Sequence, residues 1–298
     1  TPWQKLRRNL LLFLQLLVLA GLVMALAQPV IAVPSVSSGS LIVLLDASAS
    51  MNARDVAPTR FEAARAVVRN LIDGLSGDAR MTLIQVGYQP EVLAASVNDR
   101  ARLRRILQTA APTNGEADWK KAFALASGAA RSGQSNQPAA IVIVSDGGLP
   151  ETGLPSLPGE VSYVPVGSSA NNLGISALAL RPAGENLELF AQLTNYSEQP
   201  RQVVLSIYRN GELINARAVK IASKDNKAIT LTDLPAGESI YKARIEPIGA
   251  EGKELDALPL DDIAFAVHQG QKDRRILIIS KGNFFLEQVL NALPNVTA

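Results

Sequence analysis

Residues 39–168 alternate between short apolar runs and longer stretches in which apolar positions recur every three or four residues. Short apolar runs bounded by polar turns are typical of buried strands, and the three-to-four spacing predicts helices with one apolar face. Because these helices separate strands that are too apolar to have a wet face, the pattern predicts an α/β domain with an open, doubly wound, Rossmann-like parallel sheet covered on both sides. We expect strands at 41–45, 81–86, 91–95, 140–144 and 161–166, and helices at 59–75, 100–108 and 117–130.

Residues 169–270 show a different pattern, with short segments in which apolar and polar residues alternate. Such alternation is typical of strands that are buried on one face only. Turn-forming residues separate the segments, notably Asn210–Gly211, a pair that favours tight hairpins. Seven short strands with no helical stripe between them predict an immunoglobulin-like β-sandwich. The expected strands are 175–180, 187–193, 202–208, 213–220, 228–231, 240–245 and 263–267.

Residues 10–27 form an apolar run in which Gln15 is the only strongly polar residue. As a helix this run spans about 27 Å, close to the hydrocarbon thickness of a bilayer. Three basic residues precede it within positions 5–8, and no further cation follows until Arg54. By the positive-inside rule we expect a transmembrane helix in the cell membrane, with a cytoplasmic N-terminal flank and extracytoplasmic domains after it. A signal peptide and a buried core helix are the alternatives.

The C-terminal stretch predicts a strand at 274–280 and a helix at 283–293. One strand and one helix cannot bury their own apolar faces, so we expect them to be the first unit of a truncated α/β domain. The expected units are a transmembrane helix with a basic cytoplasmic flank at 1–33, the doubly wound domain at 34–168, the sandwich at 169–270 and the first βα unit of the further domain at 271–298.

The composition narrows the chemistry that the chain can carry. Hydrophobic residues make up 47% of its 298 residues and the formal net charge is +2, which allows packed cores and gives no reason to expect nucleic acid as a partner. There is no cysteine, which excludes disulfides, thiolate metal sites and cysteine nucleophiles. The single histidine, His268, falls in the expected sandwich and excludes a multi-histidine metal site. Oxygen atoms remain as the available ligands.

Oxygen-bearing side chains follow two of the expected buried strands. Asp46, Ser48 and Ser50 come at the end of the first strand, and Asp146 follows the strand at 140–144. Because ligands bind beyond the carboxyl ends of such strands, these side chains are expected in one crevice, where the loop before a helix can bring Thr113. Two carboxylates and three hydroxyls suit Mg²⁺ or Mn²⁺. Hydroxyls neutralise the ion only weakly, so a carboxylate from a partner would complete its shell.

The stretch "DASASM" (46–51) resembles the Asp-x-Ser-x-Ser motif of von Willebrand factor A (VWA) domains. The apolar strand before the motif and the later strand that ends in Asp146 agree with that family. The resemblance implies a metal-ion-dependent adhesion site in which Asp46, Ser48 and Ser50 carry the motif and Asp146 is the later aspartate.

The family's threonine lies in a loop before a helix, and here that loop, "PTNGEADW", departs from the usual form. Thr113 is our assignment, and Asp118 is its rival. If Asp118 binds the metal instead, the site gains a negative charge and its affinity for a partner carboxylate should fall.

A wider resemblance covers nearly all of the chain. The N-terminal segment resembles the second membrane helix of bacterial BatA-type proteins, known as aerotolerance regulators. The sandwich strands, with "DALPLDDIAFAV" (256–267), and the C-terminal βα unit resemble larger members, in which a glutamine-amidotransferase-like fold follows. The resemblance implies a membrane-tethered, extracytoplasmic interaction protein, and it suggests a system with a MoxR-type AAA+ ATPase as partner.

These observations predict a binding module rather than an enzyme, in which a metal ion captures an acidic side chain of a protein partner. One alternative is a metal-independent scaffold with a degenerate site. The other is a Mg²⁺-dependent phosphotransfer enzyme with Asp46 as nucleophile, but haloacid-dehalogenase-type enzymes have a second aspartate where this chain has Ser48. No phosphate-binding glycine motif is present, and His268 is too far along the chain to serve as a base for a serine nucleophile.

Overall fold

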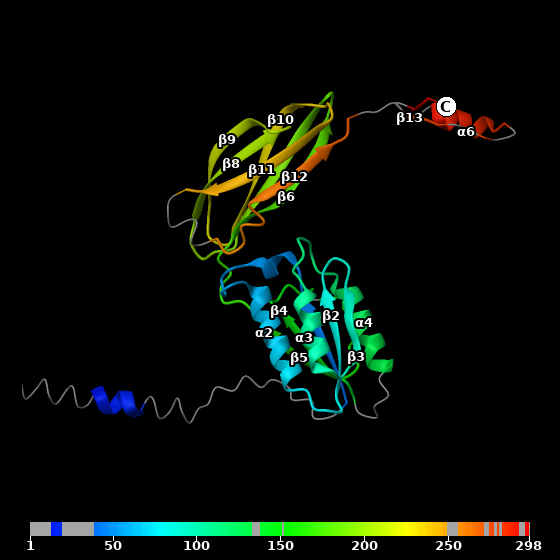
Figure 1. The fold of residues 1–298 in the computed structure, drawn as a ribbon. Coiled ribbons are helices and arrows are strands. Elements are labelled where there is room, and N and C mark those ends of the chain that lie inside the picture. The colour runs from blue at the N-terminus through cyan, green and yellow to red at the C-terminus, as the bar shows by residue number, and fades with distance from the viewer. Residues whose placement is uncertain are drawn as a thin grey trace, which may run out of the picture.

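The computed structural model describes residues 13–19, 39–132, 138–150, 152–248, 256–270, 274–276, 279, 282–291 and 296–297. Within these residues the chain forms an α/β domain and a β-sandwich, joined by residues 166–172. The sandwich lies over the end of the α/β domain toward which strand β2 points (Figure 1). The carboxyl ends of the parallel strands therefore face the second domain.

The sheet of the α/β domain has the order β3-β2-β1-β4-β5, with β1 (Ser40–Asp46) at its centre. β1 pairs in parallel with β2 (Arg80–Val86) and with β4 (Ala140–Ser145), and β4 pairs in parallel with β5 (Glu160–Pro165). The parallel sheet expected from the sequence is thus present. Apart from its first residue, β1 is buried along its whole length, which explains its unbroken apolar run.

Both edges of the sheet differ from the prediction. β3 (Glu91–Val97) runs antiparallel to β2, because a short connection without a helix joins the two strands. At the other edge, Val161 and Tyr163 of β5 are 47% and 45% exposed. The described residues between β4 and β5 form no helix, so one face of β5 is uncovered. The expectation of a sheet covered on both sides was therefore wrong for this strand.

Helices cover the two faces of the central strands. α2 (Arg60–Asp73) and α3 (Arg100–Thr109) pack on one face, where Val43 of β1 belongs to the core. α4 (Trp119–Ser132) packs on the other face against Leu44. Successive side chains of a strand point to opposite faces, so an apolar strand supplies both cores at once.

The sandwich consists of a three-stranded sheet, β10-β7-β6, and a four-stranded sheet, β12-β11-β8-β9. All paired strands within these sheets are antiparallel, and the seven strands expected from the alternating pattern are all present. One core contains side chains from both sheets, among them Leu189 of β7 and Tyr241 of β11. The strands are β6 (Leu173–Ala183), β7 (Asn186–Asn195), β8 (Arg201–Arg209), β9 (Glu212–Ile221), β10 (Asp225–Pro235), β11 (Ser239–Pro247) and β12 (Ile263–His268).

Hydrogen bonds join the two domains at the carboxyl end of the α/β sheet. The backbone N–H of Arg54 donates to the carbonyl of Ala257 in the sandwich, at 2.8 Å. The carboxylate of Asp55 accepts from the backbone N–H groups of Ser168 and Ser169 in the connecting segment, at 2.7 and 2.9 Å. The sandwich is therefore held against the edge at which the candidate metal ligands lie.

The two ends of the chain are described only in part. Most of the expected membrane span at 10–27 and its basic flank lie outside the described residues, and residues 13–19 form a short helix. Among the described residues, none of the helices combines the length and the apolar character that crossing a bilayer requires. At the other end, β13 (Arg274–Arg275) pairs in parallel with β14 (Val296–Thr297), and α6 (Phe284–Asn291) lies between them in the chain. Much of the strand expected at 274–280 also lies outside the described residues.

Candidate metal-binding site

Asp46 is a fully buried carboxylate at the end of the central strand. Its Oδ1 accepts a hydrogen bond of 2.8 Å from the backbone N–H of Ser48, and its Oδ2 accepts one of 2.5 Å from the hydroxyl of Ser145. Burial raises the pKa of Asp46, and the hydrogen bonds from Ser145 and Ser48 oppose this effect. Among the described residues, no lysine, arginine or histidine forms an ion pair with Asp46.

The hydroxyl groups expected from the sequence gather beside Asp46. The Oγ atoms of Ser48 and Ser50 lie 3.1 Å apart, because the 3₁₀ turn η1 (Ala49–Asn52) folds the loop back on itself. Thr113 contacts the same loop from a distant part of the chain. Its backbone N–H and its hydroxyl both donate to the carbonyl of Ala47, each at 2.7 Å. Thr113 therefore lies against the residue that follows Asp46.

Asp118, the rival for the position of Thr113, has another role. Its Oδ1 accepts a hydrogen bond of 3.0 Å from the backbone N–H of Lys121, and its Oδ2 lies 2.8 Å from the ammonium of the same residue. A carboxylate placed in this way caps the start of α4 and is favoured by the helix dipole. Of the two candidates, Thr113 is the one that contacts the loop after Asp46.

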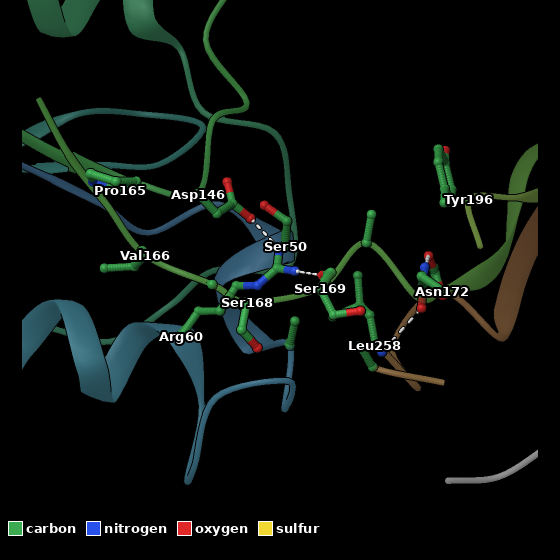
Figure 2. A pocket seen from close by; sticks show the side chains of 15 residues that line it. Ser50, Arg60, Asp146, Pro165, Val166, Ser168, Ser169, Asn172, Tyr196 and Leu258 are labelled. Atoms are coloured by element: carbon green, nitrogen blue, oxygen red, sulfur yellow. Dashed lines mark hydrogen bonds and ion pairs between the residues drawn. The ribbon is translucent and has the colours of Figure 1, made fainter. Parts of the chain in front are cut away.

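Asp146 does lie at the carboxyl end of β4, but it is already paired. Arg60 Nη1 donates to Asp146 Oδ2 at 2.7 Å, and Arg60 Nε donates to Asp55 Oδ1, also at 2.7 Å. Figure 2 shows the side chains of Asp146 and Ser50 close together, with the guanidinium of Arg60 below them. The side chains of Asp55, Asp146 and Arg60 are 3%, 5% and 15% exposed, so these are buried ion pairs. Arg60 is therefore the cationic partner of Asp146, but its single positive charge is shared with Asp55.

The Arg60 guanidinium also connects the candidate site with the domain junction, since its Nη2 donates to the carbonyl of Ser169 at 2.7 Å. Burial opposes the ionisation of Asp55. Hydrogen bonds from Arg60 and from the backbone of Ser168 and Ser169 outweigh that effect and lower its pKa to about 2. Asp146, Asp55 and the connecting segment are thus held by one arginine.

Sequence reasoning missed two groups of residues here. Ser145 precedes Asp146 in "IVIVSDGG", and a hydroxyl beside an aspartate at a strand end is a signal that could have been used. The backbone carbonyl of Ser145 also accepts from the hydroxyl of Tyr163, at 3.0 Å. Arg60 and Asp55 carry no such signal, because the partners Arg60 and Asp146 are 86 residues apart in the chain.

A cavity of about 550 Å³ lies between the candidate site and the sandwich. Ser50, Asp146 and Arg60 line it on the side of the α/β domain, and Tyr196 and Leu258 line it on the side of the sandwich. Figure 2 shows these two groups toward the two ends of the connecting segment. A ligand bound at the candidate site can therefore contact both domains.

A second acidic cluster stands at the base of the sandwich. The carboxylates of Asp256, Asp261 and Asp262 lie within 4.8 Å of one another. Burial and the neighbouring carboxylates raise the pKa of Asp261 to about 6 and that of Asp262 to about 8, and Arg244 opposes the shift of Asp262 only in part. Asp262 also shares a side-chain hydrogen bond with Asp256. The cluster therefore retains a proton at neutral pH.

This cluster predicts an unusual dependence of stability on pH. Because the folded pKa values of Asp261 and Asp262 exceed the ordinary value of 3.8, the folded state binds more protons than the unfolded chain between about pH 4 and 8. The free energy of unfolding should therefore fall as pH rises through this window. Asp262→Asn keeps a hydrogen-bond donor without the charge. Because solvent screens this partly exposed position and reduces the effect, we expect the substitution to raise that free energy at pH 8 by only about 2 kcal/mol.

Urea unfolding at pH 5 and pH 8 measures this effect. The control is Asp233→Asn, which removes one charge at an exposed position of β10. Equal stability of Asp262→Asn and the unchanged protein at pH 8 would contradict the assignment of the proton to this cluster.

Comparisons with known proteins find a family model that matches most of the α/β domain. Residues 41–148 match the model of the von Willebrand factor type A domain. A UPF0353 protein of Mycolicibacterium paratuberculosis is 27% identical over 199 residues, which are 64% of this chain and 59% of that protein. The chain thus spans less than two thirds of the length of this curated relative.

Two solved structures also resemble the chain. BatB from Bacteroides thetaiotaomicron is 25% identical, with 39% of this chain and 57% of that chain covered and a TM-score of 0.36. An aerotolerance-related membrane protein from Bacteroides fragilis is 22% identical, with 49% and 73% covered and a TM-score of 0.38. The expected A domain is confirmed by the family match over residues 41–148.

Proposed function

We propose, from the match of residues 41–148 to the model of the von Willebrand factor type A domain, that the protein is a binding module that captures an acidic side chain of a partner protein through a divalent cation. In this proposal Asp46, Ser48, Ser50, Thr113 and Asp146 hold Mg²⁺ or Mn²⁺. The apolar run at 10–27 anchors the chain in the cell membrane, and the two domains lie on the extracytoplasmic side. A MoxR-type AAA+ ATPase belongs to the same system.

The state of Asp46 is the observation that carries this proposal. A carboxylate that is removed from water without a cationic partner costs several kcal/mol. Asp46 is fully buried, and no cationic side chain among the described residues pairs with it. The paired hydroxyls of Ser48 and Ser50 follow it within four residues, and hydroxyl and carboxylate oxygens are the ligands of hard divalent cations. The donor chemistry of this edge therefore fits such an ion.

The charge balance supports a carboxylate as the partner group. Arg60 pairs with both Asp146 and Asp55, so Asp46 is the one carboxylate of the set without a cationic partner. The remaining expected ligands are uncharged hydroxyls, which offset the charge of a divalent ion only weakly, and an anion is the group that such an ion attracts. Ser48 occupies the position at which a phosphotransfer enzyme would need its second acid, which favours binding over catalysis.

The experiment uses Ser48→Ala, with Ser132→Ala at the exposed C-terminal end of α4 as the matched control. We expect Ser48→Ala to weaken Mg²⁺ binding, measured by calorimetry, by about tenfold or more, because a direct ligand is lost. It should also abolish the EDTA-sensitive capture of partner proteins from native membranes. Circular dichroism checks that the fold is intact.

The possible results separate the three functions. Capture that resists EDTA and persists in Ser48→Ala would indicate a metal-independent scaffold. Turnover of a generic phosphoester that disappears in Asp46→Ala would indicate the enzyme. The binding module requires capture that needs both the metal and Ser48.

A further inference from the structure

The sandwich forms one wall of the cavity. This wall limits which ligands can reach the candidate metal site. Ser50 and Asp146 lie on one side of this cavity, and Tyr196 and Leu258 lie on the other (Figure 2). Tyr196 is 48% exposed and is the one aromatic residue among the described residues that line the cavity on the sandwich side. A partner segment that fills this cavity therefore meets Ser50 and Asp146 on one side and Tyr196 on the other.

Hydrogen bonds fix this wall in place. The backbone N–H of Tyr196 donates to the carbonyl of Asn172 at 2.9 Å, and the side-chain oxygen of Asn172 accepts from the backbone N–H of Leu258 at 3.1 Å. The amide nitrogen of Asn172 donates to Asp261 at 2.7 Å. Ala257, the neighbour of Leu258, accepts from Arg54 of the α/β domain. A wall tied in this way is formed before a ligand arrives, which lowers the cost of binding.

The size of the cavity decides the shape of the ligand. A volume of about 550 Å³ falls in the range of sites for small ligands and short chain segments. A broad folded surface would need a flat, open face at the metal edge, but the sandwich stands over that edge. An extended segment, such as a loop or a chain end, can enter.

The charges of the cavity decide the composition of that segment. Arg60 is committed to Asp55, Asp146 and Ser169, so it offers no free cation to a second anionic group. Asp261 also lines the cavity, and its carboxylate repels another acid on the side of the sandwich. One acidic residue is favoured at the metal edge, and uncharged apolar neighbours are favoured beside Tyr196.

We propose that the partner of this site is an extended peptide segment in which a single acidic residue is flanked by apolar side chains, and that Tyr196 of the sandwich selects those flanks. This inference rests on the proposed function, since the acidic residue is held at the metal edge. Aromatic side chains at the centre of an interface commonly contribute most of its affinity. The sandwich is thus part of the binding site.

Three labelled peptides test this proposal by fluorescence anisotropy with the full chain in Mg²⁺: acetyl-Leu-Asp-Leu-amide, acetyl-Gly-Asp-Gly-amide and acetyl-Asp-Asp-Asp-amide. We expect the leucine peptide to bind about fivefold more tightly than the glycine peptide, and the triple-aspartate peptide to bind more weakly than the leucine peptide. Tyr196→Ala should remove the preference for leucine, and Tyr196→Phe should keep it. Phe265→Ala, at an exposed aromatic residue on β12, is the control and should change nothing.

The outcomes distinguish this inference from the proposed function. Binding that depends on Mg²⁺ and Ser48 but ignores both leucine and Tyr196 would overturn the inference and leave the adhesion site standing. A leucine preference that needs Tyr196 but survives EDTA and Ser48→Ala would overturn the proposed function. The absence of measurable binding of the leucine peptide at millimolar concentration would overturn the inference, and Mg²⁺ calorimetry would still test the site.

Discussion

Replacement of Arg60 by methionine is expected to lower the free energy of unfolding by about 3–5 kcal/mol at pH 7. The methionine fills a similar volume but leaves Asp55 and Asp146 buried without a cationic partner. It also removes the hydrogen bond to the carbonyl of Ser169. Urea unfolding followed by circular dichroism measures the change. The control is Arg104→Met, which breaks an exposed pair with Asp73 and should cost about 1 kcal/mol or less.

The pH dependence of the stability lost in Arg60→Met identifies the cause of that loss. The folded pKa of Asp55, about 2, lies below its ordinary value, so its ionised form contributes stability above about pH 4 that is lost as pH falls toward 2. The difference between the unchanged protein and Arg60→Met should therefore shrink in acid. If the difference in free energy of unfolding stays constant down to pH 2.5, the loss comes from the packing around Arg60 and not from the uncompensated carboxylates.

Asp46→Asn is expected to abolish the stabilisation of the protein by Mg²⁺. If Mg²⁺ binds the folded state alone, a concentration of one hundred times the Kd adds about 2.7 kcal/mol to the free energy of unfolding. The asparagine can still accept from the Ser48 N–H and can donate to the Ser145 hydroxyl, so the loop is retained. Without metal the variant should be at least as stable as the unchanged protein, because burial disfavours the charge of Asp46.

Thermal unfolding with and without Mg²⁺ measures this prediction. Asp118→Asn is the matched control, because that carboxylate caps α4 and pairs with Lys121. It should keep the full response to Mg²⁺. If Asp118→Asn loses the response and Asp46→Asn keeps it, the assignment of the site is wrong.

Arg60 connects the candidate metal edge with the segment that leads to the sandwich. It holds Asp146 at the candidate metal edge and Ser169 in the segment that leads to the sandwich. Asp55, its other partner, binds the backbone of the same segment. The position of the sandwich wall and the charge of the candidate site therefore depend on one side chain.

Local features of the chain were sufficient to predict the strands of both domains, the helices of the α/β domain and the loop that carries Asp46, Ser48 and Ser50. An apolar run such as that of β1 can be buried only inside a layered sheet, and alternation over 173–268 can be buried only on one face of each strand. The spacing of Asp46, Ser48 and Ser50 on one short loop brings their oxygens together without help from the rest of the fold. Each of these properties is decided by neighbours in the sequence.

Only the tertiary structure decided the uncovered face of β5, the ion pair of Asp146 with Arg60 and the sandwich wall with Tyr196. Each depends on which distant segments pack together, and no local pattern encodes that choice. Arg60 and Asp146 are 86 residues apart, and an arginine at the start of an amphipathic helix is equally compatible with a solvated position. Sequence alone thus determined the elements and the loop of oxygens, and the packing of the two domains determined the charge and the shape of the site around them.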